Sequence, residues 1–481
     1  MEESTTKLPK KKNQINEQNK KILILGGGIA GLSVAWRLVE EGYTIEIFER
    51  EAEVGGLSRT INYKNFLFDY SAHRFNSDNP DILKRFKQLI GKNLLVVHKK
   101  SLIYHWGKYI EYPPKVWEIV QTMPSKLLIL SCIEFVITRV YRLFKAPKTN
   151  SFSDWTRFRF GKTLSLHLNE KYAKKLWKKS PHLLSGDWAY QRIGSFKIID
   201  FVIAIFANKS YNKVFKASDP DSDVFYYPSR GIGLFPKKIS EKILNKGGTI
   251  RTQAIVNKID TIKSGYQVSY LTPDGSRKST GTHIVSTIPL DLLVKSFNPK
   301  MSKQVIHASK SLDYLAVIIV NILINRAKVT NVSWIYYPSE KILFNYIMEF
   351  KNWSKKMAPK NQTALNINIT CRIGDEIWKM TDAEITERVI QDLENVKIIT
   401  NDEVFDSFVH RLPYAYPVYD LNYQKNTQLI RSYIDTFPNF FLSGRTGNFR
   451  YINSDQAMEE GIRCAEKIIE DEKDEAFPSR D

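Results

Sequence analysis

Apolar and polar positions near the N-terminus follow two different periods. KILIL, residues 21–25, is a short apolar run that leads into glycines, which predicts a buried strand entering a tight turn. Residues 29–41 carry apolar side chains at helical spacing up to Gly42, and residues 44–50 form a second apolar run. Strand, helix and strand in succession predict a βαβ unit, whose parallel sheet needs further strands from later in the chain.

Later segments supply those strands. Residues 247–288 alternate apolar and polar positions around a turn at Pro273-Asp274-Gly275, which predicts antiparallel strands that return to the sheet. Residues 439–472 predict a strand, a loop and an amphipathic helix. Between these blocks, residues 80–225 are rich in Lys, Trp and Tyr with long helical patterns, and residues 312–402 mix apolar strands with a helix.

The turn after the first strand carries a candidate dinucleotide site. Gly26, Gly28 and Gly31 form a GxGxxG motif at the junction of strand and helix, where a pyrophosphate can approach the backbone and the helix N-terminus. Glu49 closes the second strand, where its carboxylate can accept hydrogen bonds from the ribose hydroxyls. Ile29 and Ala30 lie inside the motif, and Arg50 follows Glu49.

A second glycine pair favours a flavin over a nicotinamide cofactor. Gly55 and Gly56 are followed by Leu57, Ser58 and Arg59. Here the sequence resembles the flavoprotein superfamily that includes amine oxidases, protoporphyrinogen oxidases and UDP-galactopyranose mutases, with the mutase-like proteins closest in motif. The resemblance implies FAD as cofactor and places these residues along its pyrophosphate.

Two more segments extend the resemblance. FDYSAHRF, residues 68–75, is similar to the mutase segment that brings a histidine beside the flavin ring, which places His73 there; Ser71 replaces the usual glycine. Residues 441–461 resemble the segment that crosses the flavin and begins the last helix. The positions that the resemblance carries over are Val256 on the adenine side and Gly444, Arg445, Arg450, Tyr451, Ile452 and Asn453 in the last segment.

The substrate side is thinner in motifs. YAYPVYD, residues 414–420, resembles the mutase segment that places a tyrosine near the sugar diphosphate, and Tyr416 is the matching residue. Further cleft candidates by resemblance are Tyr172, Lys175, Trp177 and Arg192. Where the mutases hold the diphosphate with an arginine, this chain has Tyr346, which cannot supply a fixed positive fork.

These patterns predict an α/β fold. Its Rossmann-type, glutathione-reductase-like FAD domain is discontinuous and comprises residues 21–79, 226–311 and 403–472. A mixed α+β substrate domain, residues 80–225 and 312–402, is inserted into it, and residues 1–20 and 473–481 are predicted tails.

Three functions fit this cofactor. The first is an oxidoreductase that passes a hydride from an unidentified substrate to flavin N5, with His73, Arg450, Tyr416 and Arg192 as candidate catalytic residues. The second is a mutase-like isomerase of a nucleotide sugar that uses reduced FAD, as in cell-surface polysaccharide synthesis. The third is a flavin-binding protein without catalysis.

The net charge and the cysteines place only weak restrictions on the binding partners and the cellular compartment. The chain of 481 residues has a formal net charge of +20, which favours an anionic partner, and its lysines and aromatics fit no recognisable nucleic-acid module. The three cysteines have neither disulfide nor zinc spacing, so we expect no metal and a cytoplasmic protein. Residues 127–137 are apolar and are soon followed by arginines, so we expect burial or, alternatively, peripheral contact with the inner face of a membrane. The substrate is a small molecule, such as a nucleotide sugar or a lipid-linked compound, and the sequence does not fix the oligomeric state.

Overall fold

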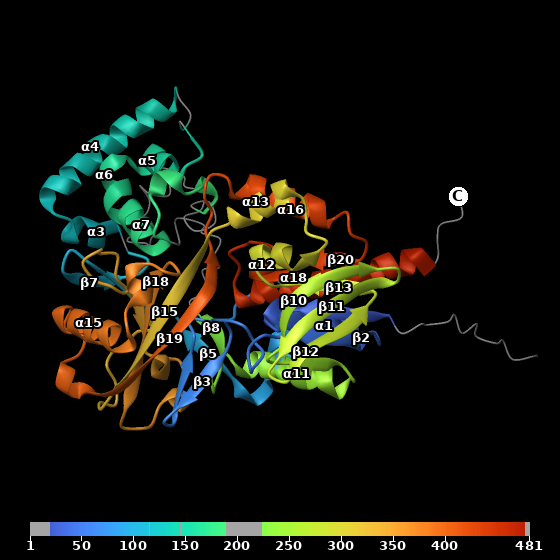
Figure 1. Cartoon of the computed structure of the whole chain (residues 1–481). Coiled ribbons are helices and arrows are strands. Elements are labelled where there is room, and N and C mark those ends of the chain that lie inside the picture. The colour runs from blue at the N-terminus through green and yellow to red at the C-terminus, as the bar shows by residue number, and fades with distance from the viewer. Residues whose placement is uncertain (1–19, 115, 145–146, 148, 189–223, 477–481) are drawn as a thin grey trace, which may run out of the picture.

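The computed structural model describes residues 20–114, 116–144, 147, 149–188 and 224–476. A five-stranded parallel sheet has the order β20-β13-β1-β2-β9. The strands are β1 (Lys21–Leu25), β2 (Thr44–Phe48), β9 (Thr249–Arg251), β13 (His283–Ser286) and β20 (Phe440–Leu442). The predicted βαβ unit is therefore confirmed, and strands from two distant parts of the chain complete its sheet (Figure 1).

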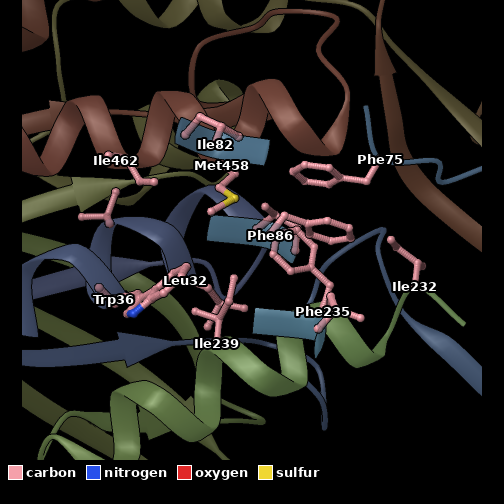
Figure 2. Close-up of a cluster of buried hydrophobic side chains, with 14 of the residues drawn as sticks. Leu32, Trp36, Phe75, Ile82, Phe86, Ile232, Phe235, Ile239, Met458 and Ile462 are labelled. Atoms are coloured by element: carbon pink, nitrogen blue, oxygen red, sulfur yellow. The ribbon is translucent and has the colours of Figure 1, made fainter. Parts of the chain in front are cut away.

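Four helices cover one face of this sheet. They are α1 (Ile29–Glu40), α2 (Pro80–Ile90), α11 (Leu234–Asn245) and α18 (Ser454–Ala476). Figure 2 shows Leu32 and Trp36 of α1, Phe86 of α2, Phe235 of α11 and Met458 of α18 meeting in one buried cluster. The sequence assigned residues 80–90 to the substrate domain, but α2 packs here because its apolar stripe, Ile82, Phe86 and Ile90, faces this core.

A small four-stranded sheet and three helices cover the opposite face. The strands are β10 (Ile255–Ile262), β11 (Gly265–Thr272), β12 (Gly275–Gly281) and β14 (Phe297–Asn298), and the helices are α12 (Leu290–Ser296), α13 (Lys303–Lys310) and α16 (Tyr423–Ile434). The predicted turn at residues 273–275 joins β11 to β12, after which β13 returns to the parallel sheet.

The second lobe is built on a seven-stranded mixed sheet in the order β19-β15-β18-β17-β16-β6-β7. Its strands are β6 (Ser101–His105), β7 (Lys108–Glu111), β15 (Tyr314–Ile324), β16 (Trp334–Tyr336), β17 (Tyr346–Met348), β18 (Thr363–Cys371) and β19 (Val404–Pro417). Helix α15 (Asp382–Asn395) packs on one face, with α14 (Glu376–Lys379) before it. The sequence assigned β19 to the FAD domain, but β19 pairs along β15 and is the edge strand of this sheet.

A helical layer lies above this sheet in Figure 1. It comprises α3 (Val116–Thr122), α4 (Ser125–Arg142), α5 (Phe152–Phe160), α6 (Lys162–Leu164), a π-helical turn (Ser165–Glu170) and α7 (Lys171–Trp177). The hairpin β3 (Thr60–Tyr63) and β4 (Phe66–Asp69) and the antiparallel pair β5 (Leu94–His98) and β8 (Val224–Pro228) lie between the lobes. Helix α18 continues to Ala476, so residues 473–476 are helical and not part of the predicted C-terminal tail. A search of the described residues finds no helix that combines the length and apolar character needed to cross a bilayer.

Candidate functional site

A cavity of about 650 Å³ opens at the carboxyl edge of the parallel sheet, beside β19. Ligands of open α/β sheets bind at this edge. The predicted residues that line the cavity are Gly26, Gly28, Ile29, Ala30, Glu49, Arg50, Gly55, Gly56, Leu57, Ser58, Arg59, His73, Val256, Gly444, Arg445, Ile452 and Asn453. The fold thus brings together residues that are more than 400 positions apart in the sequence.

Each of the three glycines of the GxGxxG motif is required for a different steric reason. Gly26 has a φ of +103°, and a Cβ there would lie 2.4 Å from Thr287 Oγ1. A Cβ at Gly31 would lie 2.1 Å from the carbonyl oxygen of Gly26, so Gly31 lets helix and strand pack and does not itself line the cavity. A Cβ at Gly28 would meet nothing within 4 Å, because this position faces the open cavity. Gly28 therefore leaves room for a pyrophosphate against the backbone.

Glu49 follows β2 directly and is only 7% exposed. Its Oε2 accepts a hydrogen bond from the Gly27 amide at 2.8 Å, and its Oε1 accepts one from the Glu51 amide at 3.0 Å. A carboxylate has further lone pairs beyond these two bonds, so the fixed side chain can still accept hydrogen bonds from a ribose diol.

The second glycine pair faces the first turn. Gly55 and Gly28 form a parallel bridge, and a Cβ at Gly56 would lie 3.3 Å from Gly28 Cα. Arg59 donates from Nε to the Gly56 carbonyl at 3.0 Å. Ser58 Oγ lies 3.2 Å from the Oγ of Ser454 at the start of α18, which ties this loop to the end of the chain. Both glycine segments and a helix N-terminus therefore border one space, as a dinucleotide pyrophosphate requires.

Arg445 is fixed by the backbone of its neighbours. Its Nε donates to the Ile452 carbonyl at 2.9 Å and its Nη1 to the Ala415 carbonyl at 3.1 Å. Its guanidinium lies 5.4 Å from the ring centre of Tyr416 and 5.3 Å from that of Tyr451. This placement joins the loop before α18 to β19 and leaves a positive charge at the wall of the cavity.

His73 lines the same cavity with a neutral ring. Burial, and secondarily the charge of Arg445, lowers the pKa of His73 to about 3. Its Nε2 is buried and has no hydrogen-bond partner among the described residues. Because buried polar atoms are normally bonded, this nitrogen indicates a polar ligand group in the cavity.

Aromatic side chains form the wall behind His73 and Arg445. The rings of Tyr416 and Tyr451 stack with centroids 5.3 Å apart, and the ring of Trp177 lies 6.4 Å from Tyr416 and 6.0 Å from Tyr451. The hydroxyl of Tyr346 lies 2.7 Å from Ser71 Oγ and donates to Asn368 Oδ1 at 2.9 Å. These rings come from α7, β17, β19 and the segment before α18.

Burial keeps the phenols of this wall protonated. It raises the pKa of Tyr416, and it raises the pKa of Tyr172 and Tyr346 well above the usual value. Tyr172 joins the wall through Tyr336, whose ring lies 6.5 Å away. These phenols are therefore neutral hydrogen-bonding groups at physiological pH.

Some predicted residues do not reach the cavity. The side chain of Arg450 is 53% exposed and pairs with Glu460 at 2.5 Å, so the prediction that it acts at the flavin is not supported by its position. Lys175 is buried and donates to the carbonyls of Tyr337 and Phe344. Tyr416 and Tyr451 belong to the aromatic wall and do not line the cavity itself. Arg192 lies outside the described residues.

The sequence missed two parts of the wall. The first is the end of β13 and the turn after it, where Thr287, Ile288 and Pro289 line the cavity; an apolar strand that ends at polar residues was the available signal. The second is the part of β19 just before the YAYPVYD segment, residues 410–413. No local pattern marks that part, because its role depends on where β19 crosses the edge of the other lobe.

The comparisons with known proteins decide the family. The family described as flavin-containing amine oxidoreductase matches residues 29–469. The chain belongs to this family. Its cofactor is FAD, and as a member of this family it is a flavin-dependent oxidoreductase.

Curated relatives align with this family member only locally. A polyenoic fatty acid isomerase of Ptilota filicina is 42% identical over 53 residues, which is 11% of this chain and 11% of the relative. A 4,4'-diapophytoene desaturase of Staphylococcus aureus strain COL is 28% identical over 108 residues, 22% of this chain and 20% of the relative. The matches thus span about a fifth or less of the relatives' own length.

Solved structures extend the likeness to the whole fold. A reduced UDP-galactopyranose mutase has a TM-score of 0.80 at 18% identity and covers 94% of both chains. A putative protoporphyrinogen oxidase from an Exiguobacterium species has a TM-score of 0.71 at 17% identity, covering 95% of this chain and 99% of that one. Putrescine oxidase bound to putrescine has a TM-score of 0.65 at 15% identity, covering 94% and 99%. These likenesses confirm the predicted α/β architecture.

The residues of the cavity fit FAD. Gly28 leaves open space beside the second glycine pair, Glu49 is fixed at the end of β2, and the buried Nε2 of His73 has no partner in the described chain. These features match what a pyrophosphate, a ribose and a ring with polar edges require of a binding site.

Proposed function

We propose that this protein oxidises a C–H bond of a small molecule, next to a nitrogen or to another carbon, with bound FAD as the hydride acceptor. The observation that carries the proposal is the neutral aromatic wall of Tyr416, Tyr451, Trp177 and Tyr346 beside His73 and Arg445. A hydride leaves with both electrons of its C–H bond, so its departure needs no base. The positive charge left on carbon is neutralised by the lone pair of a neighbouring nitrogen or by loss of a proton to solvent, and a wall of phenols suits such a step.

Bound FAD supplies the electron acceptor for this chemistry. The protein supplies position and environment. Glu49 would hold the ribose, Gly28 and the second glycine pair would hold the pyrophosphate, and the fixed guanidinium of Arg445 would favour the negative charge of the reduced state. The aromatic wall would exclude water from a substrate bound against it.

A mutase-like isomerase is the second candidate. The TM-score of 0.80 to a UDP-galactopyranose mutase and the position of Tyr416 favour it. Against it, Tyr346 stands where the resemblance expects an arginine, and its hydroxyl is engaged by Ser71 and Asn368. Burial lowers the pKa of Lys175 to about 7, and its Nζ donates to backbone carbonyls, so it offers no ready contact to a diphosphate. The membership in an oxidoreductase family favours either enzyme over the non-catalytic alternative.

One anaerobic experiment separates the two reactions. The oxidised holoprotein is mixed with an amine such as putrescine, a polyenoic fatty acid and 4,4'-diapophytoene, and flavin absorbance is followed; in parallel, dithionite-reduced holoprotein receives UDP-galactopyranose. We expect bleaching by one of these three donors and no UDP-galactofuranose on chromatography. Formation of the furanose by the reduced protein, without bleaching by any donor, would replace the proposal by the mutase reaction.

A further inference from the structure

Helices α3 and α4 present an apolar face to solvent. Five side chains of α4 are 53–63% exposed: Ile129, Ile133, Val136, Ile137 and Val140. Their spacing of three and four residues places them on one stripe of the helix. Leu143 and Phe144 extend the stripe beyond the end of α4 with exposures of 78% and 79%, and Val120 on α3 is also exposed. A contiguous apolar stripe of this kind differs from single exposed apolar residues, which need no explanation.

Helix α4 turns its polar side toward the protein and its apolar side toward solvent. Ser131 is buried on the inner side, and Glu134 accepts a hydrogen bond from the Thr163 amide at 2.5 Å. The guanidinium of Arg142 lies 5.3 Å from the ring centre of Phe158 on α5. Gly161 permits this close packing, because a Cβ there would lie 3.1 Å from Glu134 Cβ. The polar side of α4 thus faces α5 and α6, and the apolar side faces outward, the reverse of a helix that covers a core.

The margins of this face carry positive charge and aromatic rings. Lys126 is exposed at the start of α4, whereas Arg142 near its end packs against Phe158 on the inner side. Glu134, the acidic residue of α4, is turned toward α6. Trp117 on α3 and Tyr112 before it are 41% and 39% exposed. Tryptophan and tyrosine favour the boundary between lipid chains and water, and cations favour anionic headgroups.

We propose that α3 and α4 form a docking face for an anionic bilayer, with α4 lying in the plane of the membrane and its apolar stripe among the acyl chains. Figure 1 shows α4 at the outer edge of its lobe, where no other described element lies outside it. The net charge of +20 adds a long-range attraction to anionic lipid. This docking does not depend on which reaction the flavin performs.

The test measures binding of the FAD-loaded protein to vesicles of equal parts phosphatidylglycerol and phosphatidylcholine. We expect the native protein to sediment with them, and Ile133→Asp plus Ile137→Asp to lower the partition coefficient by roughly a hundredfold, since each lost apolar side chain contributes about tenfold. Leu244→Asp plus Leu271→Asp is the matched control, because both leucines are exposed but lie on α11 and β11, in the other lobe. Flavin content and thermal stability of each variant are measured to show that it is folded.

Cys132 gives a second, local readout. It is exposed on α4, whereas burial raises the pKa of Cys371 and Cys464 to about 12, so an environment-sensitive fluorophore attaches at Cys132. We expect its emission to shift to the blue when vesicles are added, and no shift from a label on Leu244→Cys in a Cys132→Ser background.

Two outcomes overturn the proposal. Equal vesicle binding by the native protein and the Ile133→Asp, Ile137→Asp variant would show that the stripe is not the contact. A native dimer that ignores vesicles, and that this variant converts to monomer, would assign the face to a second copy of the chain.

Discussion

At the scale of single residues, the cofactor site depends on side chains that hydrogen bonds to the backbone already hold in place. Glu49 is held by two amides, and Arg445 by two carbonyls. Such preorganised side chains lose little freedom when a ligand binds. The residue scale is also where the chemistry of the site is set, because burial lowers the pKa of His73 and raises the pKa of Tyr346, and both shifts favour the neutral side chain.

Glu49→Ala is predicted to weaken FAD binding by roughly a hundredfold, since hydrogen bonds to a charged acceptor contribute about 1.5–3 kcal/mol each. The variant also leaves the Gly27 amide without its acceptor. Flavin absorbance per protein after purification and a fluorescence titration with FAD measure the effect. Glu41→Ala, which removes a surface carboxylate paired with Arg37, is the control and keeps its flavin. Full flavin occupancy in Glu49→Ala would refute the ribose assignment.

His73 is predicted to make stability fall in acid. Its pKa of about 3 in the folded chain lies below the usual 6.5, so the unfolded chain binds a proton that the folded chain does not. The contribution of His73 to the free energy of unfolding is complete above the pKa of the unfolded chain. It falls as pH falls, and about 2 kcal/mol of it is lost at pH 5.

Thermal unfolding of the native protein and His73→Gln, both saturated with FAD, measures this effect. The difference in Tm between them is expected to shrink or reverse between pH 7 and pH 5, because glutamine does not titrate. A constant difference over that range would mean that His73 is not buried as a neutral ring. The other buried histidines titrate equally in both proteins and cancel.

At the scale of elements, the first turn and helix show how one motif combines two physical roles. Gly31 lies where α1 packs against β1 and does not line the cavity. Gly28 lines the cavity, and a Cβ placed on it would contact no other atom. The motif pattern alone predicts both glycines, but only the distances separate packing from ligand approach.

Substituting these two glycines by alanine is predicted to give opposite phenotypes. Gly31→Ala brings a Cβ within 2.1 Å of a backbone oxygen, so it should destabilise the fold by about 1–3 kcal/mol or more. Gly28 has a φ of −73°, which alanine adopts readily, so Gly28→Ala should fold normally and lose FAD. Apo-protein Tm and FAD affinity are measured for both. A Gly28→Ala variant that retains native affinity would contradict the pyrophosphate position.

At the scale of the whole molecule, the cavity lies between the lobes. Its wall comes from the first βαβ unit, the turn after β13, the edge strand β19 and the loop before α18. A ligand that touches all four segments binds the folded state and has no equivalent site in the unfolded chain, so it must stabilise the whole fold.

Removal of FAD is therefore predicted to lower Tm, and re-addition to raise stability by about 2.7 kcal/mol at a hundred times the Kd. ADP, which reaches only the part of the site near Glu49, should give a smaller increase. Scanning calorimetry of apo-protein with increasing FAD or ADP measures both. Equal shifts with the two ligands would mean that the isoalloxazine part of FAD makes no stabilising contact.

Short stretches of the sequence by themselves determine several elements of the fold and most of the predicted cofactor site. The βαβ unit, the glycine spacing, Glu49 and the second glycine pair follow from short-range patterns, because a tight turn, a strand end and a helix start each restrict the residue types at a few adjacent positions. The same local rules predicted the turn between β11 and β12 and the strand before α18.

Only the tertiary structure decided which elements share a lobe and which side chains meet. Sequence patterns placed α2 in the substrate domain and β19 in the FAD domain, yet α2 buries Phe86 against α11 and β19 pairs with β15. Arg450 matched a motif but lies at the surface beside Glu460, while residues 410–413 matched none and line the cavity. The physical reason is that strand pairing and burial join residues hundreds of positions apart, and a pattern of neighbours along the chain contains no record of those contacts.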